Sequence, residues 1–189
     1  MTTIYYVRHA EPNYENHDDQ SRELSKKGLQ DSQSLVNFFS DVPISTAYSS
    51  PYKRAMDTIS PTCQSKNLSF TILSDLRERK ITDDWIEDFS GFAQKQWADF
   101  SYRLPGGESL SEVQTRSISL IQQLVNKHPG KTILLGGHGT TLSTILNFYN
   151  SSLGFQSFQD IKHVFPLVVR FDFGDAGEFI DYQILKRLS

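Results

Sequence analysis

The chain has 189 residues, of which 38% are hydrophobic and 22% charged, and its formal net charge at pH 7 is -3. This length allows one domain with a substantial core, and the composition is that of an ordinary globular protein. A slightly acidic chain with no apolar run near the roughly 20 residues that cross a bilayer gives no reason to expect nucleic acid or a membrane as a partner.

Three short apolar runs in the first half of the chain are typical of buried parallel strands. They cover residues 4–7, 46–49 and 70–73. A polar loop over residues 10–24 follows the first of them, and a helix begins after Ser25, its expected N-cap. The apolar face of this helix is expected at Leu29, Val36 and Phe39. A second helix opens at Pro51 and should end or kink at Pro61.

The second half begins with a stretch, residues 80–107, that lacks a clear period but is rich in aromatic side chains. We expect an ordered lid there, with a short helix near 92–100. A long amphipathic helix runs from Leu110 to about Lys127. The remaining predicted elements are a strand at 132–135, a helix at 140–149, and strands at 164–173 and 178–185. The turn at 174–177 between the last two strands is a hairpin signal.

Strands that alternate with helices predict an α/β fold. We expect a three-layer α/β/α sandwich around a mainly parallel central sheet, with a lid insertion at about 80–107 and a C-terminal β-hairpin. The chain shows no internal repeat and no interdomain linker, so residues 1–189 are expected to form a single domain.

The chain start and its one cysteine favour a cytoplasmic location. Residues 1–4 run directly into a strand, so no signal peptide is visible. Cys63 cannot form an intramolecular disulfide, which fits a reducing compartment. It also lacks a flanking histidine or glycine-rich anion loop, so a buried, inert thiol is a simpler interpretation than a nucleophile.

Basic side chains follow several of the predicted strands. They are Arg8, His9, Arg54 and His138. Because the carboxyl ends of parallel strands share one edge of a sheet, these four side chains can converge despite their separation in sequence. Two guanidiniums and two imidazoles in one crevice describe a pocket for a doubly charged oxyanion such as phosphate.

Such a pocket suits the chemistry of phosphate esters, whose charged oxygens repel nucleophiles until they are neutralised. An imidazole nitrogen can attack phosphorus and form a phosphohistidine that water later hydrolyses. His9 is the best nucleophile candidate, because a backbone carbonyl bound to Nδ1–H would leave its Nε2 free to attack. A metal site built from His9, His138 and acidic residues is conceivable, but the adjacent arginines would repel a cation. We therefore expect no metal and no cofactor.

The ensemble of motifs resembles the histidine phosphatase superfamily and, within it, the phosphoglycerate mutase-like branch. The motifs are Val7-Arg8-His9-Ala10-Glu11, Ser50-Pro51-Tyr52-Lys53-Arg54-Ala55, Leu76-Arg77-Glu78, Pro105-Gly106-Gly107-Glu108-Ser109 and Gly137-His138-Gly139. They occur in the family's order and cover roughly residues 4 to 185.

The resemblance implies a role for each matching position. His9 matches the family's phosphorylated histidine, and Glu78 matches the proton donor, which protonates the leaving oxygen and later activates water. The positions that match substrate-binding residues of the family, holding the transferring phosphoryl group, are Arg8, Arg54 and His138. A simpler interpretation of Glu78 is an exposed partner for Arg77 or Arg79. The reserve candidates for the proton donor are the lid residues Asp83, Asp84, Glu87 and Asp88.

Some positions depart from the family or need no catalytic role. Ala10 stands where the family usually has glycine; its carbonyl remains available, so activity should be retained. Asn13 and Asn16 lie near an asparagine phosphate ligand of the family's mutases, but neither falls on that position. Arg116 is expected to be a structural, hydrogen-bonding arginine, and Glu108 is explained by the helix dipole. The histidines expected at the surface are His17, His128 and His163.

Residues 80–104 hold three cations against five acids, a poor environment for an anionic carboxylate ligand. Water is therefore favoured over a second substrate as the final phosphoryl acceptor. We expect a metal-independent phosphomonoesterase whose partner is a small phosphorylated substrate. The alternatives are a phosphoglycerate mutase-type phosphoryl transferase and a non-catalytic phosphate-ester binding or regulatory protein. The lid aromatics suggest a leaving group with apolar surface; they are Trp85, Phe89, Phe92, Trp97, Phe100 and Tyr102.

Overall fold

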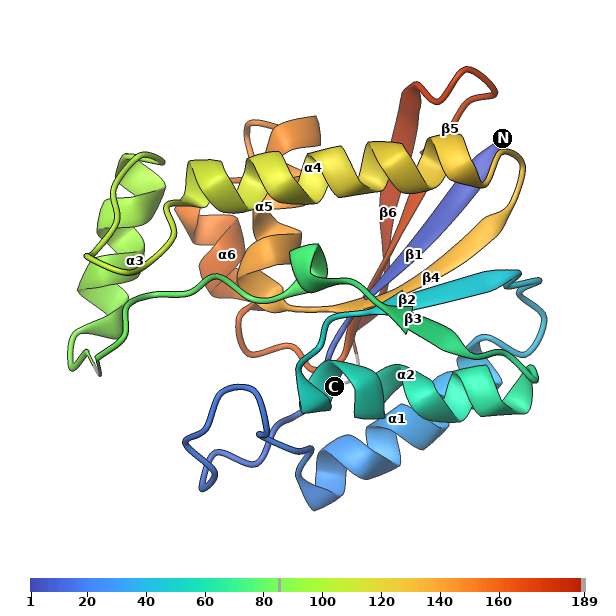
Figure 1. The fold of residues 1–189 in the computed structure, drawn as a ribbon, viewed down its shortest axis with the longest axis horizontal. Coiled ribbons are helices and arrows are strands. Elements are labelled where there is room, and N and C mark those ends of the chain that lie inside the picture. The colour runs from blue at the N-terminus through green and yellow to red at the C-terminus, as the bar shows by residue number, and fades with distance from the viewer. Residues whose placement is uncertain (85, 188–189) are drawn as a thin grey trace.

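In the computed structural model, which describes residues 1–84 and 86–187, six strands form one sheet in the order β3-β2-β4-β1-β5-β6 (Figure 1). The strands are β1 (Thr2–Arg8), β2 (Thr46–Ser49), β3 (Phe70–Ile72), β4 (Thr132–Gly137), β5 (Leu167–Phe173) and β6 (Phe179–Arg187). Strands β1 to β4 pair in parallel, whereas β5 is antiparallel to β1 and to β6. The predicted mainly parallel sheet with a C-terminal hairpin is therefore confirmed.

Helices cover both faces of this sheet. They are α1 (Lys26–Phe38), α2 (Lys53–Ser65), α3 (Phe89–Ala98), α4 (Leu110–Lys127), α5 (Gly139–Tyr149) and α6 (Phe155–Ile161), with a 3-10 turn at Ser74–Leu76. Helices α1 and α2 pack on one face, and α4, α5 and α6 on the other (Figure 1). Neighbouring residues of β1 alternate between the two cores: Tyr6 packs under α4 and α5, and Val7 under α1 and α2. The predicted three-layer α/β/α sandwich is confirmed.

The lid region contains the expected short helix, although α3 begins at Phe89 rather than near residue 92. Phe92 is 6% exposed and belongs to the core, and the Trp97 ring packs on Phe158 of α6 with 5.7 Å between centroids. The lid aromatics therefore largely fix α3 in place. Trp85 lies outside the described residues. Helix α6, which receives Trp97, was not predicted.

One face of α1 differs from the prediction. Leu29 is 52% exposed, and the buried positions of the helix are Gly28, Ser32 and Leu35. The cause is a close backbone approach, because a Cβ at Gly28 would overlap the carbonyl oxygen of Glu11. A glycine therefore determines which side of α1 faces the protein. A prediction from the pattern of apolar residues cannot detect this.

Helix α2 does not end at Pro61 but continues to Ser65. Proline leaves the carbonyl of Asp57 without its helical amide partner, and both residues lie on the partly exposed side of the helix, where water can hydrate that carbonyl. Cys63, on the inner side, is buried as expected, and burial raises the pKa of its thiol to about 11. In the part of the chain that the structure describes, no helix is both long and apolar enough to cross a membrane.

Candidate active site

The four basic side chains predicted to converge lie together where β1 and β4 end. The His9 amide donates to the carbonyl of Gly137 at 3.0 Å, and the rings of His9 and His138 lie 5.4 Å apart. Arg54, in the first turn of α2, donates from Nε to Nε2 of His9 at 3.3 Å. All four side chains are buried: Arg8, His9, Arg54 and His138 are 6%, 6%, 4% and 0% exposed.

The His9 imidazole is held in one tautomer. Its Nδ1 lies 2.7 Å from the carbonyl oxygen of Ala10, which can only accept, so Nδ1 carries the proton. The Arg54 contact then falls on the lone pair of Nε2. Burial lowers the pKa of His9 well below its usual range, and the charges of Arg54 and Arg8 lower it further. His9 is thus a neutral imidazole with an oriented lone pair at Nε2, the state that a nucleophile requires.

In His138 the ring nitrogen without a partner in the described part of the chain is Nδ1, whereas in His9 the nitrogen with the available lone pair is Nε2. Nε2 of His138 lies 2.7 Å from Oγ of Ser50, and Ser50 Oγ accepts from the amide of Tyr52 at 3.2 Å. Among the described residues, the buried Ser50 hydroxyl has no acceptor other than Nε2 of His138, so its proton is assigned to that contact and the ring proton to Nδ1. Within residues 1–84 and 86–187, this buried Nδ1 has no hydrogen-bond partner. A buried donor of this kind suits a bound oxyanion.

We predict that Ser50→Ala lowers kcat/KM by roughly ten- to a hundred-fold. The substitution removes the hydroxyl that contacts Nε2 of His138 and thereby keeps the ring proton on Nδ1. Steady-state kinetics with a phosphate ester measure this effect. Ser49→Ala is the matched control, since Ser49 is an equally buried neighbour whose hydroxyl donates to the Ser50 carbonyl instead. An equal loss of activity in both variants would mean that Ser50 acts through packing alone.

Arg8 is directed mainly at the protein itself. Its Nη1 donates to the carbonyls of Ile161 and Val164, and Nη2 donates to that of Lys162 at 2.7 Å. Its guanidinium also lies over the Phe165 ring, 4.1 Å from the centroid. Arg8 therefore fastens the carbonyl end of α6 to the end of β1. Its buried Nε has no partner among the described residues and is the group left for a ligand.

Glu78 joins the same edge through backbone contacts. Its carboxylate accepts from the amides of Thr140 and Thr141 at 2.9 and 3.1 Å, directly after His138. The interpretation of Glu78 as an exposed ion-pair partner is wrong: it is half-buried, Arg77 pairs with Glu108 at 2.6 Å, and Arg79 donates to Gln96 at 2.9 Å. The first turn of α5 thus holds a carboxyl group two residues beyond His138.

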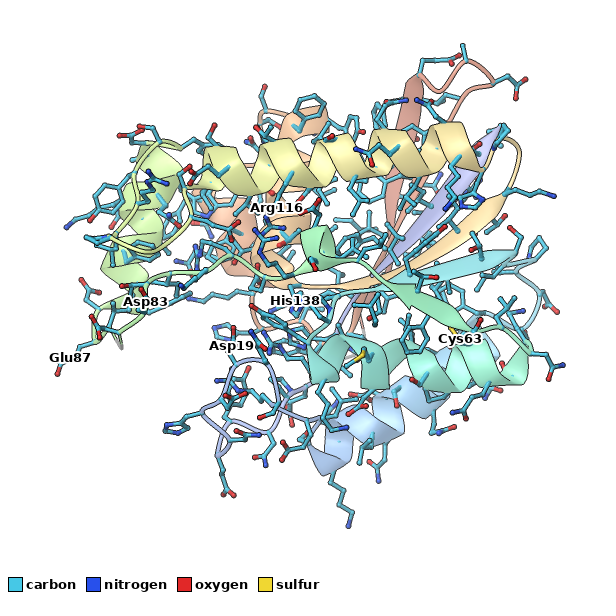
Figure 2. All side chains as sticks on the ribbon, viewed as in Figure 1. Asp19, Cys63, Asp83, Glu87, Arg116 and His138 are labelled. Atoms are coloured by element: carbon cyan, nitrogen blue, oxygen red, sulfur yellow. The ribbon has the colours of Figure 1, made fainter. Side chains whose placement is uncertain are left out.

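The reserve acids of the lid take other partners. Asp83 pairs with Lys80, and Asp88 caps α3 by accepting from the Gly91 amide at 2.8 Å. Figure 2 shows Asp83 and Glu87 beside α3, away from His138. Asp83, Glu87 and Asp88 therefore do not join the basic cluster.

The other residues considered from the sequence have structural contacts. Arg116 donates to Glu108 at 2.9 Å and to the Asp75 carbonyl at 2.7 Å, as expected of a structural arginine. Glu108 is more than a helix-dipole residue, because it also pairs with Arg77. His163 and His17 are exposed as expected. The prediction for His128 is wrong, because it is half-buried and lies 2.7 Å from the hydroxyl of Tyr48.

The two asparagines bind the loop to itself. Asn13 and Asn16 donate to the two carboxylate oxygens of Glu23 at 2.7 and 2.8 Å. The hydrogen bonds from Asn16 and Asn13 lower the pKa of Glu23 to about 2. These asparagines therefore shape the loop over residues 10–24. This loop also brings Asp19 onto Arg54 at 3.1 Å, a contact that the sequence did not indicate.

The buried histidines make a prediction for the pH dependence of stability. The pKa values of His9 and His138 lie well below the roughly 6.5 of an unfolded histidine, so below pH 6.5 the unfolded chain binds more protons. Above pH 6.5 these two histidines do not change the free energy of unfolding with pH. Below pH 6.5, each of them lowers it by up to about 1.4 kcal/mol per pH unit as the pH drops. Urea unfolding at pH 7.5 and 5.5 measures this effect. Between these pH values, the free energy of unfolding should fall less for His9→Asn than for the exposed control His163→Asn. An equal fall in both variants contradicts the prediction.

Comparison with known proteins identifies the family of this chain. The histidine phosphatase superfamily (branch 1) matches residues 4–181. Phosphoglycerate mutase-like protein 4 of Arabidopsis thaliana is 30% identical over 161 residues, covering 75% of this chain and 68% of that protein. Phosphoserine phosphatase 1 of Hydrogenobacter thermophilus is 24% identical over 157 residues, covering 73% and 71%. The structure of YhfR from Bacillus stearothermophilus superposes with a TM-score of 0.81 at 25% identity and covers 95% of both chains. With the family matched over nearly its whole length, this chain belongs to the histidine phosphatase superfamily.

Proposed function

We propose that the protein is a phosphomonoesterase that hydrolyses small phosphate esters through a phosphohistidine at Nε2 of His9. The observation that carries the proposal is the state of this imidazole: neutral, fixed by the Ala10 carbonyl, and in contact with the guanidinium of Arg54. A neutral nitrogen nucleophile beside a buried cation is what attack on a phosphate dianion needs. Membership of the superfamily supports the same reading.

The proposed reaction has two steps. In the first, the Nε2 lone pair of His9 attacks phosphorus, the bond to the ester oxygen breaks, and Glu78, which enters this step in its protonated form, gives its proton to that oxygen. In the second, Glu78 takes a proton from water, the water oxygen attacks phosphorus, and the N–P bond breaks to release phosphate. The charge on the phosphoryl oxygens is met by Arg54, by the free Nε of Arg8 and by Nδ1–H of His138. No metal or cofactor takes part in this scheme.

Water is proposed as the final acceptor because two of the three lid cations are already paired with carboxylates. Lys80 pairs with Asp83, and Arg103 pairs with Glu112 at 2.7 Å. The second candidate is a mutase-type phosphoryl transferase, which the phosphoglycerate mutase-like relative favours. The substrate is proposed to be a small phosphorylated molecule in the cytoplasm, consistent with the buried free thiol of Cys63.

The test is hydrolysis of para-nitrophenyl phosphate in a metal chelator by the wild type and by His9→Ala. We expect steady turnover by the wild type and none by the variant. A folded wild type that does not turn over this ester or a panel of phosphate esters would contradict the proposal. Phosphoryl transfer from 2,3-bisphosphoglycerate to a phosphoglycerate, in place of hydrolysis, would favour the mutase instead.

A further inference from the structure

The guanidinium of Arg54 is occupied by the protein's own anion. Its Nη1 donates to the backbone carbonyl of Asp19, and its Nη2 lies 3.1 Å from the Asp19 carboxylate. The third nitrogen, Nε, contacts Nε2 of His9. The Asp19 carboxylate therefore lies on the same guanidinium that contacts the nucleophile (Asp19 is labelled in Figure 2).

A second arginine approaches the same carboxylate oxygen. Nη1 of Arg22 lies 3.7 Å from Oδ1 of Asp19, the atom that also contacts Arg54, and Nε of Arg22 is held by the Asn16 carbonyl at 2.7 Å. The side chains of Arg22 and Arg54 are 19% and 4% exposed, whereas that of Asp19 is 53% exposed. The two cations are therefore fixed within the protein, and the anion between them lies at the solvent side.

The positive charge of Arg22 also acts on the nucleophile candidate, His9. Its charge is among those that lower the pKa of His9, and it lowers the pKa of Arg54 as well. The Asp19 oxygen lies between two guanidiniums, one of which also contacts the nitrogen that would carry the phosphoryl group. It has the charge and the hydrogen-bonding needs of a phosphoryl oxygen.

We propose that Asp19 occupies the place of a phosphoryl oxygen on Arg54, that the phosphate group of the substrate displaces it, and that Arg22 then becomes a further phosphate ligand. The proposal rests on the proposed function, because it takes a phosphate ester as the incoming anion. Asp19 therefore competes with the substrate for Arg54. Arg22 adds a further cation to the three phosphate-binding groups identified from the motifs, which are Arg8, Arg54 and His138.

The loop can release the Asp19 side chain without unfolding. Asn13 and Asn16 tie it to Glu23, and the amide of Lys53 donates to the Gln20 carbonyl at 2.9 Å. None of these contacts uses the Asp19 carboxylate. An ion pair with one exposed partner is weak, so a dianionic phosphate can replace the carboxylate readily.

The test is calorimetric titration with inorganic phosphate in a chelator. Asp19→Asn should bind phosphate about three- to five-fold more tightly than the wild type, because the competing charge is gone. Arg22→Gln should bind it about ten-fold more weakly, with partial recovery in Arg22→Lys. Asp18→Asn is the matched control: the Asp18 carboxylate accepts from the Ser21 amide at 2.7 Å, which asparagine can still do, so the affinity should stay within two-fold. In ester hydrolysis, Asp19→Asn should lower KM by the same factor as the phosphate Kd.

Phosphate binding by Asp19→Asn that is no tighter than by Asp18→Asn would overturn the role of Asp19. Wild-type affinity in Arg22→Gln would overturn the role of Arg22. If that variant does not fold, wild-type affinity in Arg22→Lys would do so, because a phosphate ligand at this position predicts weaker binding by lysine. A wild type that binds no phosphate contradicts the whole inference. Because calorimetry does not need turnover, the proposed function fails separately: the expected affinities without ester hydrolysis would contradict it alone.

Discussion

His9→Asn is expected to lower kcat/KM for phosphate esters by on the order of 10⁴-fold or more, because it removes the atom that forms the covalent intermediate. Asparagine is a suitable replacement, since its amide can donate to the Ala10 carbonyl as Nδ1 does, while it has no atom at the position of Nε2. Phosphate binding should therefore be retained while turnover is lost. Steady-state kinetics and phosphate titration of the same preparation measure both quantities.

The matched control is His163→Asn, which changes an exposed histidine outside the basic cluster and should keep wild-type rates. If His9→Asn retains activity within ten-fold of the wild type, the nucleophile has been misplaced. If it loses phosphate binding as well as turnover, the loss of turnover is no longer evidence for covalent catalysis.

Glu78→Gln is expected to produce the second largest effect, a loss of about 10²- to 10⁴-fold in kcat/KM for an alkyl phosphate such as phosphoserine. Alkyl oxygens are strongly basic and need a proton as they leave, whereas the nitrophenolate oxygen leaves readily without one. The loss with para-nitrophenyl phosphate should therefore be much smaller. The single oxygen of glutamine can still accept from the Thr141 amide, whereas the Thr140 amide, which donates to the other carboxylate oxygen, loses its acceptor. The comparison of the two esters separates this effect from the loss of the proton.

The decisive quantity is the ratio of the two losses. Equal losses with the alkyl and aryl esters would make Glu78 a positioning residue and not the proton donor. Asp83→Asn serves as the control, because Asp83 is a lid acid that pairs with Lys80 and should not discriminate between the esters.

The basic cluster could be predicted from the sequence because its geometry follows from topology. Arg8, His9 and His138 end or directly follow strands that pair in parallel, and such ends meet at one edge in any fold of this class. The tautomer of His9 was predicted on the expectation that a backbone carbonyl accepts from Nδ1–H, and the carbonyl of Ala10 does so. Glu78 needed the family resemblance, because its position depends on an amide pair in α5.

Other parts of the site depend on local conformations without a sequence signal. Asp19 reaches Arg54 only because the loop over residues 10–24 folds back on Glu23. Arg8 turns to the end of α6, a helix of seven residues that is too short to show an amphipathic period. The exposed face of α1 at Leu29 has the same kind of cause, since the contact between Gly28 and Glu11 is made by backbone atoms.

The most direct test of a phosphohistidine is to trap it. The enzyme is mixed with excess phosphate ester, quenched in alkali within milliseconds and digested with trypsin. Cleavage after Arg8 releases a peptide that runs from His9 to Arg22 and also contains His17, so fragment ions must separate the two histidines. We expect one phosphoryl group, on His9, formed before the steady state and absent from His9→Asn. A phosphoryl group on His17, or steady turnover with none on His9, would contradict the account.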